Sequence, residues 1–178
     1  MTHEAMIALA TEAGFTDAEV LSTAEIPFEP AFRVCCEDNA CGKYGVNYAC
    51  PPNCGTTAEM ADRIRSHRYA LLLQTMWEIA DPLDGPATKA AKKAHNARHK
   101  QLISVLSEKH HGFTIGVSGC DLCPVCAITE NLPCRFPTEK FSCMSAYCIY
   151  VQQLTERCGM EYDSGPGLVN LFSMFVFD

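Results

Sequence analysis

Four segments of the chain have the hydrophobic pattern of β-strands. Residues 69–77 are almost continuously apolar, which is typical of a strand that is buried on both faces in the middle of a sheet. Residues 19–26 and 113–117 carry β-branched and aromatic side chains, and residues 168–177 follow a Gly-Pro-Gly turn. Together these segments predict a sheet of about four strands.

Helical patterns lie between these strands. Residues 3–13 have an apolar side, and residues 56–68 begin with a Thr-x-x-Glu capping box. After a turn over residues 81–86, the alanine-rich residues 87–109 predict one long helix. A last helix, ended by Gly159, is indicated by apolar side chains at intervals of three and four: Met144, Cys148, Val151, Leu154 and Cys158.

The order of these elements repeats once along the chain. Each half reads strand, cysteine-rich loop, helix, strand, and the long helix joins the two halves. We therefore expect one cysteine-rich domain over residues 1–178, of α/β or α+β class, with helices packed on a single sheet. If each unit is a right-handed crossover, both cysteine loops reach the same edge of the sheet and lie side by side.

The clearest chemical signal is a set of four thiols in the second loop, spaced C-x2-C-x2-C-x7-C. They are Cys120, Cys123, Cys126 and Cys134. Three thiols on one tight loop, with a fourth just downstream, have the arrangement that ligation of a [4Fe-4S] cluster requires. Structural zinc also takes four thiolates, but its ligands usually form two short knuckles well apart in the sequence. Disulfides are disfavoured, because three of these cysteines crowd one turn.

The first loop holds five thiols within residues 35–54. We expect metal ligands at Cys36, Cys41, Cys50 and Cys54, with Cys35 left over. Glycine and proline make this segment a loop, and no apolar periodicity explains its thiols as packing. Their spacing matches no ferredoxin pattern, so the alternative is that two or three of them are simply buried.

Three more cysteines follow the second loop. Cys148 and Cys158 fall on the apolar stripe of the last predicted helix, so we expect core thiols there. Cys143 is either a core thiol or an extra ligand.

Composition and charge narrow the classes of function. Twelve cysteines without a basic, apolar leader predict a cytoplasmic protein with reduced thiols rather than a secreted disulfide scaffold. The net charge of −7 argues against nucleic-acid binding. No apolar run approaches the roughly 20 residues that cross a bilayer, so no membrane is expected as a partner. So many thiols on oxygen-sensitive clusters would suit an anaerobic host.

The long helix is basic. Six of the 14 basic residues fall between residues 89 and 109, whereas residues 85–107 contain no Asp or Glu. This stripe is either a docking face for an acidic redox partner or, in the interpretation that we favour, a solvated face. His95 and His99 have the i, i+4 spacing of metal ligands, but no Glu or Cys accompanies them, so we expect surface histidines.

These motifs together resemble a known family. They are Cys36-x4-Cys41-Gly-x-Tyr-Gly-x4-Cys50-Pro-Pro, the C-x2-C-x2-C-x7-C-Arg-x-Pro run, Met144-x-Ala146-Tyr147 and the final Gly-Pro-Gly. The chain is similar over nearly its whole length to the cysteine-rich "predicted metal-binding protein" family, a domain of unknown function found mainly in anaerobic bacteria and archaea. The resemblance implies a metal, foremost iron–sulfur. That family usually has Ser and Gly at positions 143 and 148, so the resemblance implies that Cys143 and Cys148 are not ligands.

We expect an iron–sulfur protein with one or two [4Fe-4S] clusters that exchanges electrons with a partner protein. Arg135 is a candidate hydrogen-bond donor to the cluster sulfurs, although a surface salt bridge explains it equally well. One alternative is an enzyme whose cluster has three protein thiols and one open iron that acts as a Lewis acid near Arg33, Lys43 and Tyr44. The other is a zinc module with a structural or interaction role. Catalytic residues and oligomeric state stay open.

Overall fold

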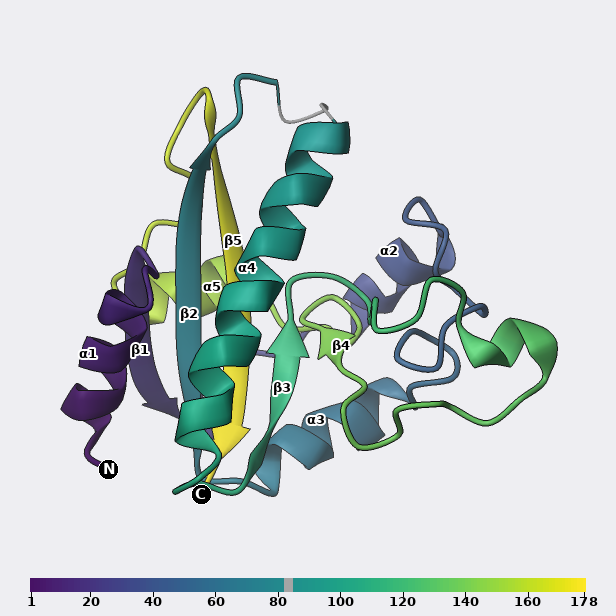
Figure 1. The fold of residues 1–178 in the computed structure, drawn as a ribbon, viewed down its shortest axis with the longest axis horizontal. Coiled ribbons are helices and arrows are strands. Elements are labelled where there is room, and N and C mark those ends of the chain that lie inside the picture. The colour runs from purple at the N-terminus through teal and green to yellow at the C-terminus, as the bar shows by residue number, and fades with distance from the viewer. Residues whose placement is uncertain (82–84) are drawn as a thin grey trace.

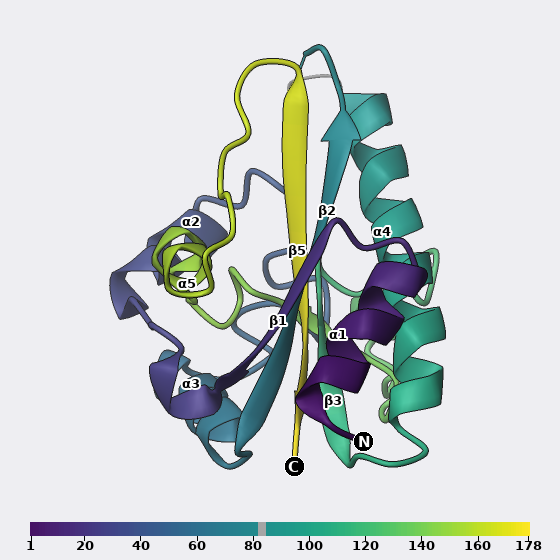
Figure 2. The same ribbon diagram turned by 90° about the vertical axis from the view of Figure 1, so that its left-hand side faces the viewer.

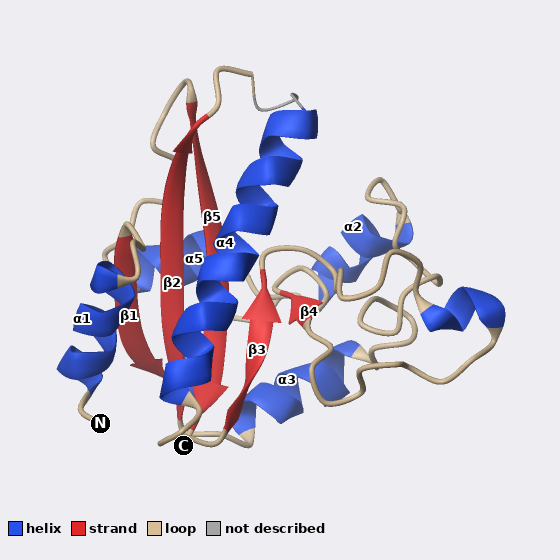
Figure 3. Ribbon diagram, viewed as in Figure 1, coloured by secondary structure: helices blue, strands red, loops and turns tan. Residues whose placement is uncertain are grey.

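A computed structural model describes residues 1–81 and 85–178, and within them the chain forms a five-stranded sheet with helices on both faces (Figure 1, Figure 3). The strands are β1 (Asp17–Ser22), β2 (Tyr69–Glu78), β3 (Gly112–Gly116), β4 (Ser142–Cys143) and β5 (Leu168–Phe177). The helices are α1 (His3–Glu12), α2 (Arg33–Glu37), α3 (Thr57–Arg65), α4 (Gly85–Leu106) and α5 (Val151–Arg157), with 3-10 turns η1 (Thr23–Glu25), η2 (Pro30–Phe32) and η3 (Ala127–Glu130). The predicted class is confirmed. The additional strand, β4, is too short for a hydrophobic pattern to reveal, and the turn expected at residues 81–86 lies partly outside the described residues.

The sheet is built around one central strand pair. β2 and β5 lie antiparallel over ten residue pairs, from Tyr69 opposite Phe177 to Glu78 opposite Leu168. β1 pairs antiparallel with β2, and β3 pairs antiparallel with β5, so the two strand–loop–helix–strand units lie on opposite sides of the centre. β4 extends one edge by pairing parallel with β3.

The expectation of right-handed crossovers is wrong, because the two strands of each unit are antiparallel neighbours. Ser22 at the end of β1 lies opposite Tyr69 at the start of β2, so the chain leaves and re-enters the sheet at the same end. An antiparallel neighbour can be reached without crossing the sheet. Residues 23–68 therefore form a long excursion that carries the first cysteine loop.

Helices cover both faces of this sheet. Figure 2 shows α1 and α4 on one face and α2, α3 and α5 on the other. Leu71 and Leu73 of β2 pack in the core beneath α1 and α4, whereas Ala70 and Leu72 pack with α3 and α5. Burial of each leucine stabilises the fold by roughly 1.5–3 kcal/mol. β2 is buried on both faces, as its continuous apolar pattern predicts.

Capping boxes decide where two elements begin. The predicted box at the start of α3 is confirmed, since Glu59 N donates to Thr56 Oγ1 at 3.2 Å and Thr56 N donates to Glu59 Oε2 at 2.8 Å. A second box joins Ser22 and Glu25 at the start of η1. It ends β1 at Ser22, so the strand predicted for residues 19–26 is wrong in its second half.

The last predicted helix is wrong in its first half. Only Val151–Arg157 is helical, whereas residues 144–148 form turns and Cys148 has a positive φ of 54°. Tertiary pairing explains the difference, because Glu29 N donates to Cys148 O at 2.8 Å and Tyr150 N donates to Pro27 O at 2.9 Å. These hydrogen bonds keep residues 148–150 out of a helix, against the local apolar periodicity.

The prediction of surface histidines on α4 is also wrong. His95 and His99 are 0% and 1% exposed, because they lie on the side of the helix that packs on the sheet. His95 Nδ1 lies 2.6 Å from Thr75 Oγ1, and His95 Nε2 lies 2.7 Å from Ser173 Oγ, so both ring nitrogens have a partner. Burial lowers the pKa of each histidine to about 3, which keeps both rings neutral.

We expect acid to destabilise the fold through these two histidines. Their pKa falls from 6.5 in the unfolded chain to about 3 in the fold, so below pH 6.5 the unfolded state binds protons that the folded state does not. The stabilisation is fully present above pH 6.5. As the pH falls below 6.5, the free energy of unfolding decreases by up to about 1.4 kcal/mol per pH unit for each histidine. Urea unfolding at a series of pH values measures the slope. His95→Gln should reduce the slope by roughly half, and an unchanged slope would contradict this account.

Candidate metal centre

The two cysteine loops lie side by side beyond the β4 edge of the sheet, away from α1 and β1 (Figure 1). Asn47 Nδ2 of the first loop donates to Cys120 O of the second at 2.9 Å, and Tyr48 OH donates to Leu132 O at 2.8 Å. Cys50 Sγ lies so close to Gly119 that a Cβ at that position would be 2.8 Å from the sulfur. The expectation that the loops are neighbours is confirmed, although not by the crossover geometry that led to it.

The second loop turns back on itself through η3. Leu132 N donates to Ala127 O at 3.0 Å, and Asn131 adopts a left-handed conformation with φ of 54°. Asn tolerates this conformation better than most residues. The reversal brings the chain back toward the first three cysteines of the loop.

The four predicted thiols of the second loop line one cavity of about 180 Å³. They are Cys120, Cys123, Cys126 and Cys134, and each is partly buried. Residues 42–49 of the first loop contribute Gly42, Lys43 and Val46–Ala49 to the same lining. Burial raises the pKa of Cys120, while backbone N–H groups of Leu122 and Phe141 donate to its sulfur and oppose the shift.

No tight single-ion site is formed by the side chains as they lie. Within residues 1–81 and 85–178, no three Cys, His, Asp or Glu side chains are placed to hold one metal ion. All twelve cysteines are free thiols. The four sulfurs therefore share a cavity without meeting at a common point.

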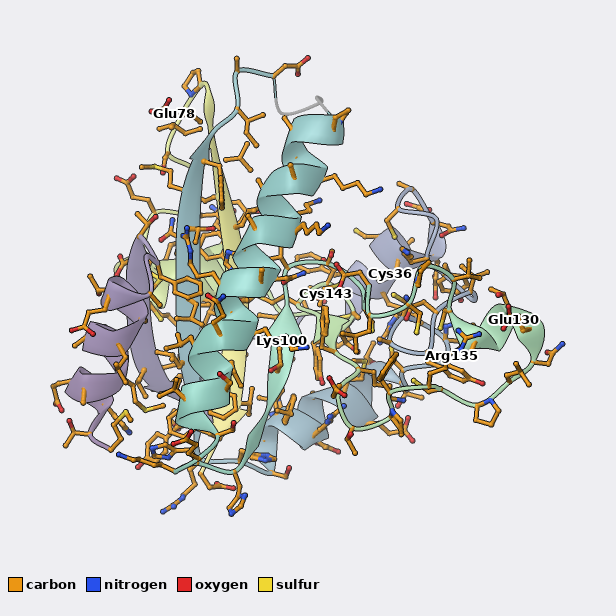
Figure 4. All side chains as sticks on the ribbon, viewed as in Figure 1. Cys36, Glu78, Lys100, Glu130, Arg135 and Cys143 are labelled. Atoms are coloured by element: carbon orange, nitrogen blue, oxygen red, sulfur yellow. The ribbon has the colours of Figure 1, made fainter. Side chains whose placement is uncertain are left out.

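Arg135 lines the cavity and forms hydrogen bonds with residues around it. Its guanidinium donates to Val125 O at 3.0 Å and to Glu130 Oε2 at 2.6 Å (Figure 4). A hydrogen bond to the sulfur of Cys123, together with the charge of Glu130, raises the pKa of Arg135. Arg135 therefore forms the salt bridge of one sequence interpretation, and its role as a donor to cluster sulfurs stays a prediction.

In the first loop, Cys36 and Cys50 interact electrostatically with Cys143 of β4. Burial raises the pKa of Cys36 to about 11 and that of Cys50 to about 12, and for both groups Cys143 is the thiol with the largest further effect. Cys36 Sγ lies 3.8 Å from Ser145 O, two residues beyond Cys143 (Figure 4). Cys41, which is exposed, also acts on the pKa of Cys36, Cys50 and Cys143.

Cys54 has different surroundings. Its Sγ lies 3.2 Å from Met60 Sδ of α3 and 3.9 Å from Arg33 Nη1. Cys143 is instead half-buried, which raises its pKa, while the backbone amides of Ala146 and Ser145 oppose the shift. Such donors stabilise a thiolate. The position of Cys143 depends on the parallel pairing of Gly116 with Cys143, which no local pattern predicts.

Cys148 and Cys158 lie in two different environments. Cys148 is buried, and Arg33, Cys54 and Cys35 act on its pKa, which burial raises. Cys158 packs against the core between α5 and the sheet. Burial raises the pKa of Cys158 to about 11, and its charged neighbours are carboxylates of residues 17, 19 and 25 rather than thiols.

The fold and the site define a class of protein: a small α/β protein that presents cysteines on two adjoining loops at one edge of its sheet. Residues 19–177 match the family described as "Predicted metal-binding protein (DUF2284)". The match covers nearly the whole chain, and the protein belongs to this family. No curated protein and no solved structure matches the chain. None of the helices in the described part of the chain has the length and apolar character of a membrane-spanning segment.

We expect Asn47 to matter more to the joined loops than Tyr48 does. Asn47 is buried, and Asn47→Ala leaves Cys120 O and Ala49 N without their partners, at a cost of about 1–3 kcal/mol. Tyr48→Phe removes one exposed hydrogen bond and should cost about 0.5–1.5 kcal/mol at most. Urea unfolding measures both costs. Equal stability of the two variants would show that the loops are not held by Asn47.

Proposed function

We propose that this protein is an iron–sulfur protein that binds a [4Fe-4S] cluster through Cys120, Cys123, Cys126 and Cys134 and exchanges electrons with a partner protein. One observation carries the proposal: all four thiols line a single cavity. The C-x2-C-x2-C-x7-C spacing is of the kind that iron–sulfur ligation uses. Membership in a family of predicted metal-binding proteins supports the coarser part of this proposal.

The spacing of the four thiols along the chain supports a cluster over a single zinc ion, since structural zinc usually takes its ligands from two short knuckles well apart in the sequence. Four thiolates on zinc lie about 2.3 Å from one centre, whereas the thiolates of a [4Fe-4S] cluster bind four different iron atoms. The described thiols share a cavity of about 180 Å³ without converging on one point. A bound cluster would supply one-electron redox chemistry at this edge of the protein.

The chain offers hydrogen bonds that would adjust the potential of the site. The backbone amides of Leu122 and Phe141 lower the pKa of Cys120, and Arg135 interacts with Cys123, so these groups would donate to the sulfurs of a bound cluster. Donors to ligating sulfurs stabilise negative charge on them, which favours the reduced state. Arg135 adds a full positive charge beside the ligands. Its bond to Glu130 holds the guanidinium in that place.

Apolar side chains around the loops support a protein partner. Large hydrophobic residues are exposed on α2 and on both loops: Val34, Val46, Val125, Leu132 and Phe136. Exposed apolar groups that gather in one region mark interaction surfaces more often than scattered ones do. A partner that docks there would come close to the thiol cavity, as electron transfer requires.

We propose a second metal group in the first loop, with Cys36, Cys41, Cys50 and Cys143 as its ligands. Cys143 is the thiol with the largest effect on the pKa of Cys36 and of Cys50, and Cys41 acts on all three, which supports this set. Cys54 also acts on the pKa of Cys50, so the proposal that Cys143 replaces Cys54 as the fourth ligand is tested by the variants below. Contacts of Cys54 with Met60 and Arg33 provide a packing role for that thiol.

Iron and acid-labile sulfide in anaerobically purified protein test the first group. We expect Cys123→Ser to remove the content of one cluster, because serine replaces one of its four thiolates. Cys158→Ser is the matched control, since its thiol packs in the core near no other thiol, and it should retain full metal content. Colourless protein that contains only zinc would refute the proposal, and equal iron loss in both variants would refute the assignment of ligands.

A second pair of variants tests the first loop. Cys143→Ser should lower the iron content that remains in Cys123→Ser protein, whereas Cys54→Ser should leave it unchanged. The reverse result would restore Cys54 as the ligand. Loss in neither variant would mean that only three protein thiols hold this group, which is the open-site arrangement of an enzyme.

A further inference from the structure

A second and larger hollow lies beside the cysteine loops. It is a groove of about 620 Å³ between α4, β3 and the segment 137–141 that follows the second loop. Sites for small molecules commonly occupy about 300–1,000 Å³. Asp121 and Leu122, which stand between Cys120 and Cys123, form part of its wall. The groove therefore adjoins the thiol cavity without sharing its cysteines.

The base of the groove holds buried polar groups that lack partners. His99 lines the groove, and neither of its ring nitrogens has a hydrogen-bond partner in the described structure. Asn96 Nδ2 is likewise buried and unpaired, while its Oδ1 accepts from Val117 N at 3.1 Å. Buried polar groups are nearly always hydrogen-bonded, so an exception requires an explanation.

His95, one turn earlier on α4, provides an internal comparison. Both of its ring nitrogens are bonded to hydroxyl groups of β2 and β5. The sheet thus provides hydrogen-bond partners for both ring nitrogens of His95 and for neither ring nitrogen of His99. The difference is that His99 faces the groove, where a bound molecule would supply the missing partners.

The charge and the apolar lining define what would fit. Four basic side chains line the groove, and Lys100 projects from α4 on the side of β3 (Figure 4). They are Arg63, Lys93, Lys100 and Lys140, against the two carboxylates Asp121 and Glu139. Glu139 is occupied in part by Lys100, whose Nζ lies 3.8 Å away. The remaining wall is apolar and aromatic, with Ile103, Phe113, Leu122, Phe141 and Phe175.

We propose that this groove binds a small hydroxycarboxylate with an apolar body. The lysines bind the carboxylate, and the aromatic wall covers the apolar body. A neutral imidazole has one donor and one acceptor, so His99 pairs with a ligand hydroxyl through one nitrogen and with an oxygen acceptor through the other. Because His99 is almost fully covered, the ligand reaches the ring only when a side chain that lines the groove moves aside. This site does not depend on the proposed cluster.

Calorimetric titration of the purified protein with three matched compounds tests the proposal. Mandelate carries a phenyl body, a hydroxyl and a carboxylate, phenylacetate lacks the hydroxyl, and phenylethanediol replaces the carboxylate by a neutral group. We expect mandelate to bind more tightly than either of the others. The proposal is overturned if mandelate does not bind in the millimolar range, if the diol binds equally well, or if inorganic phosphate competes as strongly as phenylacetate does.

Variants on α4 locate the binding. Replacing Lys93 and Lys100 by glutamine should weaken mandelate binding by about fivefold or more, since two exposed charges are removed and Glu139 loses its partner. Lys89→Gln removes an exposed charge of the same helix that does not line the groove, and it should leave the affinity unchanged. An equal effect of the double variant and Lys89→Gln would show nonspecific attraction and refute the site.

His99→Phe keeps an aromatic ring at this position and removes both nitrogens. We expect this variant to lose the preference for mandelate over phenylacetate, and retention of that preference would refute the role of His99. Should the variant fail to fold, ¹⁵N spectra of the histidine rings in the unaltered protein decide the question. A mandelate-induced shift of a histidine ring resonance that phenylacetate does not reproduce supports the proposal, and its absence refutes it.

Discussion

The antiparallel pairing of β2 with β5 carries the rest of the structure. These strands share ten residue pairs, and most of their side chains are buried. β1 and β3 attach to the outer sides of this pair, and each helical layer packs on one of its faces. Because both units connect antiparallel neighbours, the chain can leave the sheet for long excursions at little topological cost. The cysteine loops are parts of those excursions.

The loops themselves have little of the stability that the sheet has. They contain short helices and turns, and a few hydrogen bonds such as those of Asn47 and Tyr48 hold them together. Burial raises the pKa of several of their thiols, so these groups are protonated in the metal-free protein at neutral pH. Metal binding would displace those protons and contribute its own free energy to the order of the loops. The sheet holds the ends of the loops in place, and the thiols of the loops are the candidate metal ligands.

The α4 helix connects the two halves physically as well as in sequence. Its inner side contributes His95, which closes a buried hydroxyl network, and His99, which lies at the base of the groove. Of the six basic side chains at residues 89–109, four are exposed, as the interpretation of a solvated face predicts: Lys89, Lys93, Lys100 and Lys109. Arg98 donates to Gly14 O and lies over the rings of Phe15 and Trp77, whereas Lys93 and Lys100 line the groove. A run of basic residues along a helix therefore predicts an exposed face, but the contacts of each side chain depend on the elements that pack around it.

The sequence alone determined those features whose causes are local. Continuous apolar residues predict β2, a Thr-x-x-Glu box predicts the start of α3, and the C-x2-C-x2-C-x7-C spacing groups the four thiols that line one cavity. Only the tertiary structure decided the antiparallel arrangement of the units, the burial of His95 and His99, and the non-helical path through Cys148. It also brought Cys143 to the first loop through a strand of two residues. Each of these depends on segments far apart in the chain, whose pairing outweighs local periodicity and leaves no signal in the residues nearby.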